Sequence, residues 1–214
     1  MRRWATFDCY GTLIDWNGGI GRELERLFGP NEAGEKLRGY HELEPEIQRE
    51  DPSRSYSEVM AIALARLGAP ADEHDALARS LPGWEPFPEV TAALDEARSR
   101  GWSLAILSNS DRDLIDASAA RLGVPFEETI VASEIGSYKP AFMHWLEFQA
   151  RTRADRRRQV HVGASNYHDI VPASKLRIPN VWINRDDEAA LTAPTVERDD
   201  LVDLADILDQ LIPA

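Results

Sequence analysis

Hydrophobic residues occur along the chain in two patterns, short apolar runs and longer stretches with helical spacing. The first short run, residues 4–7, ends at Asp8, as expected for a buried strand with an acid at its C-terminal tip. Residues 15–86 then show apolar positions three and four apart and little strand pattern. One such stripe covers residues 56–67 and is stopped by Gly68. The pattern therefore predicts a strand followed by a long helical segment.

Beyond the Pro-Phe-Pro sequence at 86–88, strand and helix patterns alternate to the end of the chain. Such alternation predicts an α/β fold with a parallel sheet covered by helices. The expected strands are 102–107, 129–132, 160–162 and 180–183, the expected helices are 113–122, 141–150 and 199–211, and residues 163–169 are expected to form a loop.

Polar residues gather where the predicted strands end. In open parallel sheets, ligands bind beyond the carboxyl ends of the strands. We therefore expect the functional site there, built from Asp8, Ser108, Asn109, Lys139, Ser165, Asn166 and Asp169.

Composition narrows the range of partners. A net charge of −13 and a pI of about 4.8 repel nucleic acid and anionic membranes, while a local basic pocket still allows a small anionic substrate. The basic run 151–158 is interpreted as a solvated helix end. No apolar run approaches the ~20 residues that span a bilayer, and Asp8 comes too early for a signal peptide, so we expect a cytoplasmic protein. The single cysteine, Cys9, excludes an internal disulfide and is expected in the core.

Four segments, taken in order, resemble the haloacid dehalogenase superfamily. They read Phe-Asp-Cys-Tyr-Gly-Thr-Leu at 7–13, Leu-Ser-Asn-Ser at 107–110, Tyr-Lys-Pro at 138–140 and Val-Gly-Ala-Ser-Asn-Tyr-His-Asp at 162–169. The sequence Val-Trp-Ile-Asn-Arg at 181–185 is similar to the 2-haloacid dehalogenase (type II) branch. The resemblance implies a Rossmann-like core, residues 1–14 and 87–214, with helices on both faces of its sheet. It also implies a helical cap, residues 15–86, inserted after the first strand.

The resemblance also implies roles for individual residues. Asp8 is the expected nucleophile, because a carboxylate can attack carbon or phosphorus and form an ester that is then hydrolysed. Lys139 is expected to keep Asp8 ionised. The remaining expected catalytic residues are Thr12, Asn166 and Asp169, and the expected substrate-binding residues are Tyr10, Ser108, Asn109, Arg38 and Ser165.

Two departures from the family pattern bear on the reaction. Superfamily phosphatases carry a second aspartate two residues after the nucleophile, which protonates a departing alkoxide; this chain has Tyr10, and a halide leaves without a proton. An acid that often follows the glycine of the last motif is replaced by Ala164. The resemblance to dehalogenases implies no required cofactor or metal. If the chain were a phosphatase, Asp8 and Asp169 would hold Mg²⁺.

The alignment around the predicted cap leaves alternatives open. Arg38 falls near the arginine that receives the halide in dehalogenases, but Tyr40, His41 or Glu42 could line the pocket instead. Cap aromatics such as Trp16 are expected in the core more often than in the pocket wall.

The predicted activity is hydrolytic dehalogenation of a small 2-haloalkanoic acid to a 2-hydroxy acid through an aspartyl ester. A Mg²⁺-dependent phosphatase acting on a small phosphate ester and a non-catalytic binding protein on the same fold stay open as alternatives. The resemblance also implies a homodimer, because dehalogenases of this type are often dimers.

Overall fold

The computed structural model describes residues 2–214 and has a six-stranded parallel sheet at its centre. The strand order β3-β2-β1-β4-β5-β6 places β1 in the middle, between the strands that precede the later motifs. The α/β fold predicted from the alternating pattern is thus confirmed, with all pairs of neighbouring strands parallel. The strands are β1 (Arg3–Phe7), β2 (Trp102–Ser108), β3 (Glu128–Val131), β4 (Gln159–Gly163), β5 (Asn180–Ile183) and β6 (Val196–Arg198).

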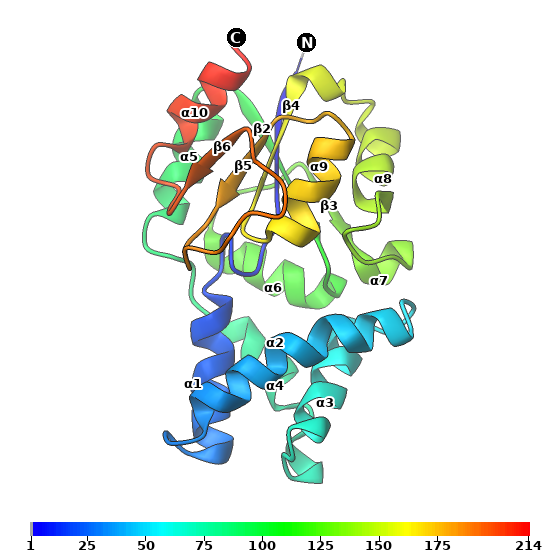
Figure 1. The fold of residues 1–214 in the computed structure, drawn as a ribbon. Helices are drawn as coiled ribbons and strands as arrows, with labels where there is room; N and C mark the ends of the chain where they lie inside the picture. Colours follow the sequence, from blue (N-terminus) through cyan, green and yellow to red (C-terminus); the bar gives the residue numbers. More distant parts are fainter. Residues whose placement is uncertain (1) are drawn as a thin grey trace.

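Both faces of the sheet are buried, because alternate side chains of each strand enter different hydrophobic clusters. Trp4 of β1 packs in one cluster with Trp145 and Phe148 of α8, whereas Ala5 and Phe7 belong to the other. Figure 1 shows α5 and α10 on one side of the sheet and α8 and α9 on the other. From residue 90 onward the helices are α5 (Val90–Ser99), α6 (Arg112–Leu122), α7 (Ala132–Ile135), α8 (Met143–Thr152), α9 (Val171–Lys175) and α10 (Leu204–Leu211), with a short 3-10 helix at Arg156–Arg158.

The stretch between β1 and α5 is helical, as the apolar spacing predicts. Its helices lie together beyond the carboxyl ends of the strands (Figure 1). The side chain of Asp15 accepts a hydrogen bond from the Gly18 amide and so caps the first of them. We call this stretch the helical insert, whereas the exact domain limits at residues 14 and 87 stay a prediction. It contains α1 (Trp16–Phe28), α2 (Ala33–Glu50), α3 (Tyr56–Arg66) and α4 (Ala76–Ser80), with 3-10 helices at Ala71–Glu73 and Leu81–Gly83.

Three local features differ from the predictions. The edge strand β6 is absent from them, because it is short and two of its three residues, Glu197 and Arg198, are exposed. The last helix begins at Leu204 rather than at 199. The expected loop 163–169 becomes a π-helix over Asn166–Ile170. Such π-turns occur frequently at functional sites. No helix among residues 2–214 is long and apolar enough to cross a membrane.

Candidate active site

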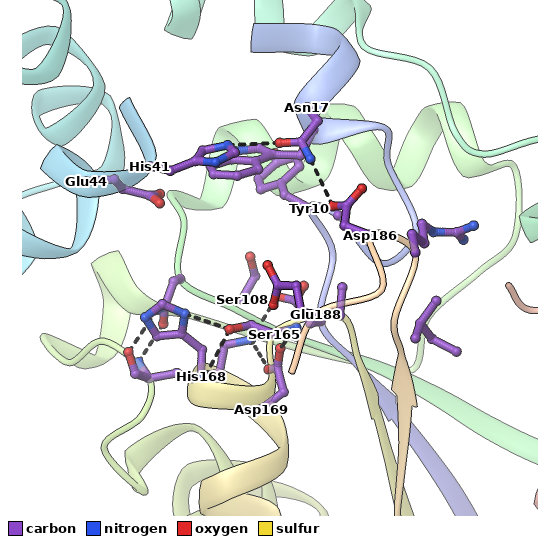
Figure 2. A pocket seen from close by; sticks show the side chains of 18 of the residues that line it. Tyr10, Asn17, His41, Glu44, Ser108, Ser165, His168, Asp169, Asp186 and Glu188 are labelled. Atoms are coloured by element: carbon purple, nitrogen blue, oxygen red, sulfur yellow. Dashed lines mark hydrogen bonds and ion pairs between the residues drawn. The ribbon is translucent and has the colours of Figure 1, made fainter. Parts of the chain in front are cut away.

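A pocket of about 360 Å³ lies where the carboxyl ends of the strands face the helical insert. Asp8, Ser108, Lys139 and Asp169 line its sheet side. Figure 2 shows Glu44 and His41 on one side of the pocket and Ser108, Ser165 and Asp169 on the other. The pocket therefore lies between the sheet and the insert, the position that the strand ends predict.

The floor of the pocket is a chain of three charged side chains. Lys139 Nζ donates to Asp8 Oδ1 at 2.8 Å and to Asp169 Oδ1 at 2.7 Å. The lysine and Asp169 are almost completely buried, while the Asp8 side chain keeps 13% exposure. An ammonium held between two carboxylates has two charge-assisted hydrogen bonds, and such bonds are stronger than neutral ones. Asp8 is thus the most exposed of these three side chains and the one that a ligand in the pocket can reach.

The pKa values of these three side chains are shifted in different directions. Burial would lower the pKa of Lys139, but Asp169 and Asp8 outweigh it and raise that pKa, so the ammonium stays charged. Burial would likewise raise the pKa of Asp169, yet Lys139 and His161 bring it below its ordinary value. At Asp8 the effect of burial is larger than that of Lys139, so the pKa of Asp8 is raised. A carboxylate with a raised pKa is a better nucleophile than an ordinary one, provided that it is ionised.

Thr12 holds the second oxygen of Asp8. Its hydroxyl donates to Asp8 Oδ2 at 2.9 Å and accepts from the Ala164 backbone amide at 2.8 Å. Gly11 allows the chain to turn between the two residues, since its φ of +85° lies in the region that favours glycine. The turn and β4 together fix the orientation of the carboxylate.

Asn109 fixes the segment that carries Lys139. Its side-chain Oδ1 accepts from the Lys139 amide at 2.6 Å, and its Nδ2 donates to the Lys139 carbonyl at 3.1 Å. Ser108 lies beside it, buried, and its carbonyl is bonded by the ring of His144. Asn109 and Ser108 both line the pocket, so the predicted binding residues of this segment are placed at the site.

His161 is a buried residue of the site that the sequence reasoning missed. Its Nε2 lies 3.2 Å from Asp169 Oδ1, and its Nδ1 lies 3.0 Å from Thr6 Oγ1. The amide of Gln159 donates to the same Thr6 oxygen at 3.2 Å. A histidine inside a strand reads as a core residue, so the strand pattern contained no signal for it. His161 therefore contacts the same Asp169 oxygen that Lys139 binds, and the two side chains together hold this carboxylate in place.

The turn after β4 carries the remaining predicted residues. A Cβ at Gly163 would lie 2.5 Å from atoms of Asp169, so glycine is needed for this approach. Ser165 donates its backbone amide to Asp169 Oδ2 at 3.3 Å and lines the pocket. Asn166 points elsewhere: its side chain bonds the backbone of Leu191 and Thr192 and is not among the pocket residues. Asn166 therefore holds a loop, and a direct catalytic contact for it is not supported.

Tyr10 lines the pocket, and its hydroxyl is occupied. It lies 3.1 Å from Ser118 Oγ, which itself donates to the Leu114 carbonyl, so Tyr10 acts as the donor. Burial raises the pKa of Tyr10 well above its ordinary value. The phenol stays neutral and is a poor proton donor for a departing alkoxide.

The expectation for Arg38 needs correction. Arg38 is exposed on α2 and does not line the pocket, because it lies one turn before the part of the helix whose face borders the pocket. That face presents His41, Glu44, Pro45 and Gln48. Among the alternatives left open, His41 lines the pocket, whereas Tyr40 is in the core and Glu42 is exposed.

The aromatic residues of the insert divide between pocket and core. Trp16 lines the pocket and stacks on His41, with ring centroids 5.0 Å apart. Trp84 is buried in the core, as is Cys9. Trp16 therefore differs from the core position expected for cap aromatics, because its ring stacks on His41 in the wall of the pocket.

The two aspartates do not fit the Mg²⁺ site that a phosphatase would need. The two oxygens of Asp8 are bonded by Lys139 and Thr12, and those of Asp169 by Lys139 and the Ser165 amide. Ala164 offers no third carboxylate. Within residues 2–214 no group of three His, Cys, Asp or Glu side chains is placed to hold a metal ion.

Comparison with known proteins identifies the family of this chain. The model of the haloacid dehalogenase-like hydrolases matches residues 3–177. An (S)-2-haloacid dehalogenase of Pseudomonas sp. (strain YL) is 29% identical over 189 residues, which cover 84% of this chain and 81% of that protein. A glyceraldehyde 3-phosphate phosphatase of Methanothermobacter thermautotrophicus is 29% identical over 101 residues, 46% of this chain and 45% of that protein.

Solved structures share the fold. The L-2-haloacid dehalogenase RSc1362 superposes with a TM-score of 0.86 at 22% identity, covering 97% of this chain and 99% of that one. An L-2-haloacid dehalogenase from Xanthobacter autotrophicus with chloropropionic acid covalently bound superposes with a TM-score of 0.83 at 17% identity, covering 97% and 98%. Because the family model covers most of the chain, this protein belongs to the haloacid dehalogenase-like hydrolases.

Proposed function

We propose that this hydrolase is a 2-haloacid dehalogenase that needs no metal and converts a small 2-haloalkanoic acid to the 2-hydroxy acid. The observation that carries the proposal is the clamp on Asp8, in which Lys139 and Thr12 each bind one carboxylate oxygen at the floor of the pocket. The named activity of the relatives from Pseudomonas supports it. So does Tyr10, which occupies the place of the phosphatase acid and stays neutral.

In the first step, an oxygen of Asp8 attacks the α-carbon of the substrate. A C–O bond forms, the carbon–halogen bond breaks, and the halide leaves with the bonding electron pair. The clamp holds the carboxylate in one orientation, and such positioning contributes much of an enzyme's rate acceleration. Because Lys139 is already shared with Asp169, its remaining role is to keep Asp8 ionised between turnovers.

In the second step, water attacks the carbonyl carbon of the Asp8 ester. The 2-hydroxy acid leaves with the oxygen that Asp8 contributed, and the carboxylate is restored with an oxygen from water. One proton of the water becomes the hydroxyl proton of the product, and the other is released to solvent. Lys139 and Thr12 then face the oxygens on which negative charge develops. The low pKa of Asp169 makes it a weak base, so we assign it to holding Lys139 rather than to deprotonating water.

Ser108, Asn109 and Ser165 supply hydroxyl and amide donors at the pocket floor, and we assign them to the substrate carboxylate. Neutral donors of this kind suit a small anion in an acidic protein, because they bind charge without requiring a buried counter-ion. The homodimer and the cytoplasmic location also stay proposals, and the homodimer rests on the resemblance. Light scattering of the purified chain tests the first, and fractionation of cells that produce it tests the second.

The test is halide release from (S)-2-chloropropionate in the presence of EDTA, beside p-nitrophenyl phosphate turnover with Mg²⁺. Chloride release that EDTA leaves unchanged supports the proposal. Phosphate release that requires Mg²⁺, without chloride release, would assign a phosphatase instead. Turnover of neither substrate, together with capture of a tight partner, would favour a binding protein.

Isotopic labelling separates attack by Asp8 from direct attack by water. In a single turnover with excess enzyme in H₂¹⁸O, the product hydroxyl should carry ordinary oxygen, and the peptide containing Asp8 should gain ¹⁸O. Label in the product after that first turnover would contradict the aspartyl ester.

A further inference from the structure

The side of the pocket that faces Asp8 lacks the arginine that the sequence predicts. In a displacement at carbon, the leaving group departs on the side opposite the nucleophile, because the reacting orbitals must be aligned. Asp8 follows β1 and attacks from the sheet side, so the halide leaves toward the helical insert. Among the described residues, the pocket face of α2 carries an imidazole, a carboxyl, a proline ring and an amide, from His41, Glu44, Pro45 and Gln48.

The two cations of the pocket are already engaged. Lys139 is bonded to both aspartates. Arg185 donates to Glu89 at 2.6 Å, and its guanidinium lies 3.6 Å from the centre of the Phe87 ring. A departing halide therefore meets neutral hydrogen-bond donors on this side of the pocket.

Glu44 and Gln48 are one turn apart on α2, and both side chains reach the pocket. Gln48 is 6% exposed, and its side-chain amide makes no hydrogen bond to another residue within 2–214. Because Gln48 borders the pocket, its amide can donate a hydrogen bond to a ligand there. Figure 2 shows the Glu44 carboxyl across the pocket from Ser165 and Asp169. The two side chains form a polar face where the halide leaves.

We propose that Glu44 is protonated in the substrate complex and donates a hydrogen bond to the leaving halide, with the Gln48 amide as a second donor. The inference rests on the proposed dehalogenation and names the residue that replaces the expected arginine. As the carbon–halogen bond breaks, the halide takes the electron pair and accepts the two hydrogen bonds. Glu44 keeps its proton, so the overall reaction is unchanged.

The surroundings of Glu44 favour the protonated form. Burial raises its pKa to about 7, opposed by a hydrogen bond from Tyr56 of α3 and assisted by the charge of Asp8. Tyr138 and Tyr40 also lie close enough to interact with it, and burial raises both of their pKa values, so they stay neutral. An anionic substrate beside Glu44 would raise its pKa further.

Other groups near Glu44 titrate away from neutral pH. Burial lowers the pKa of His41, on the same helix, and raises that of Tyr56. Lys139 has a raised pKa, and the raised pKa of Asp8 concerns the acidic limb of the rate profile, because the nucleophile must be ionised. Loss of activity above pH 7 is therefore assigned to deprotonation of Glu44.

The experiment compares wild type with Glu44→Gln and Glu44→Ala between pH 6 and 9, on 2-bromo-, 2-chloro- and 2-fluoropropionate. Glu42→Gln is the matched control, because Glu42 is exposed on the same helix. For wild type and the control, kcat/KM should fall about tenfold per pH unit above the Glu44 pKa. Glu44→Gln keeps a neutral donor and should remove this fall. Glu44→Ala should lower kcat about a hundredfold on the chloride, more on the fluoride and less on the bromide.

Two results would overturn the inference. One is an alkaline limb in Glu44→Gln that matches wild type, and the other is an equal loss for all three halides in Glu44→Ala, which indicates a structural role. Circular dichroism of each variant establishes that it is folded. If the wild type releases no halide from any of the substrates, the proposed function fails, and that outcome differs from both of these.

Discussion

Two carboxylates that share one ammonium have been given different properties by their surroundings. Asp169 is completely enclosed and bonded by Lys139, His161 and a backbone amide, so its pKa falls. Asp8 borders the pocket and has a raised pKa. Opposite pKa shifts of this kind indicate that Asp169 has a structural role and that Asp8 is the carboxylate available for chemistry.

Asp8→Asn should reduce halide release at least about a thousandfold, because an amide is a poor nucleophile although it has almost the same shape. Steady-state chloride release checks this prediction. Asp72→Asn, at an exposed position of the helical insert, is the matched control and should keep wild-type activity. An Asp8→Asn enzyme with wild-type turnover would show that water attacks without the carboxylate.

Lys139→Met should lower both activity and stability. Removing the ammonium leaves two carboxylates buried without their cation, which costs about 3–5 kcal/mol of unfolding free energy. Adding Asp169→Asn removes one of those charges, so it should restore part of the stability and none of the halide release. Urea unfolding and chloride release separate the two effects. Full activity in Lys139→Met would reduce the lysine to a structural role.

At the level of elements, the pairing of β1 with β4 builds the support behind the site. The register places Thr6 directly opposite His161, and their side chains meet at 3.0 Å. Thr6 Oγ1 also donates to the Val160 carbonyl at 3.2 Å, and His161 Nε2 lies 3.2 Å from Asp169 Oδ1, so the Thr6 hydroxyl holds the ring that contacts Asp169. Two neighbouring strands thereby orient a residue that neither of them contains.

Thr6→Val and His161→Leu should each destabilise the protein, and the double variant should lose less than the sum of the two. We expect a coupling energy of about 0.5–3 kcal/mol, the range for residues in one hydrogen-bond network. Urea unfolding of the four proteins gives this value. Additive losses would mean that the two side chains act independently, and the bond between them would then contribute nothing to the placement of Asp169.

At the scale of the whole molecule, stability should depend on pH through a buried histidine. His144 is completely buried, and burial lowers its pKa to about 3. The unfolded chain takes up a proton on this residue below about pH 6.5, whereas the folded chain does not. The contribution of His144 to the free energy of unfolding is therefore fully present above pH 6.5. It decreases by about 1.4 kcal/mol per pH unit as the pH falls toward the folded-state pKa of His144.

His144→Gln removes the titrating ring and keeps a donor for the Ser108 carbonyl. Urea unfolding between pH 7.5 and 5 should give this variant a smaller decrease than wild type on the acidic side. His74→Gln is the matched control, because the His74 ring also bonds a backbone carbonyl but lies nearer the surface. An identical pH dependence in wild type and His144→Gln would contradict the assignment.

The sequence by itself determined the order of the strands along the chain, the helical insert and the positions of the polar residues that follow each strand. Apolar runs and helical spacing are local properties, so they are readable without contacts. The edge strand β6 was not readable, because Glu197 and Arg198 are polar and the strand depends on pairing with β5. The π-helix at Asn166–Ile170 was not predicted either, and it contains Asp169, which packs against Gly163.

Only the tertiary structure decided which side chains share the pocket. Motif positions brought Asp8, Lys139 and Asp169 to one edge of the sheet. The packing of the insert over that edge decided that His41, Glu44 and Gln48 line the pocket and that Arg38 does not. His161 came to Asp169 through strand pairing, which a single strand does not reveal. Patterns along a chain fix what each element is, whereas the position of a helix over a pocket depends on packing with residues distant in sequence.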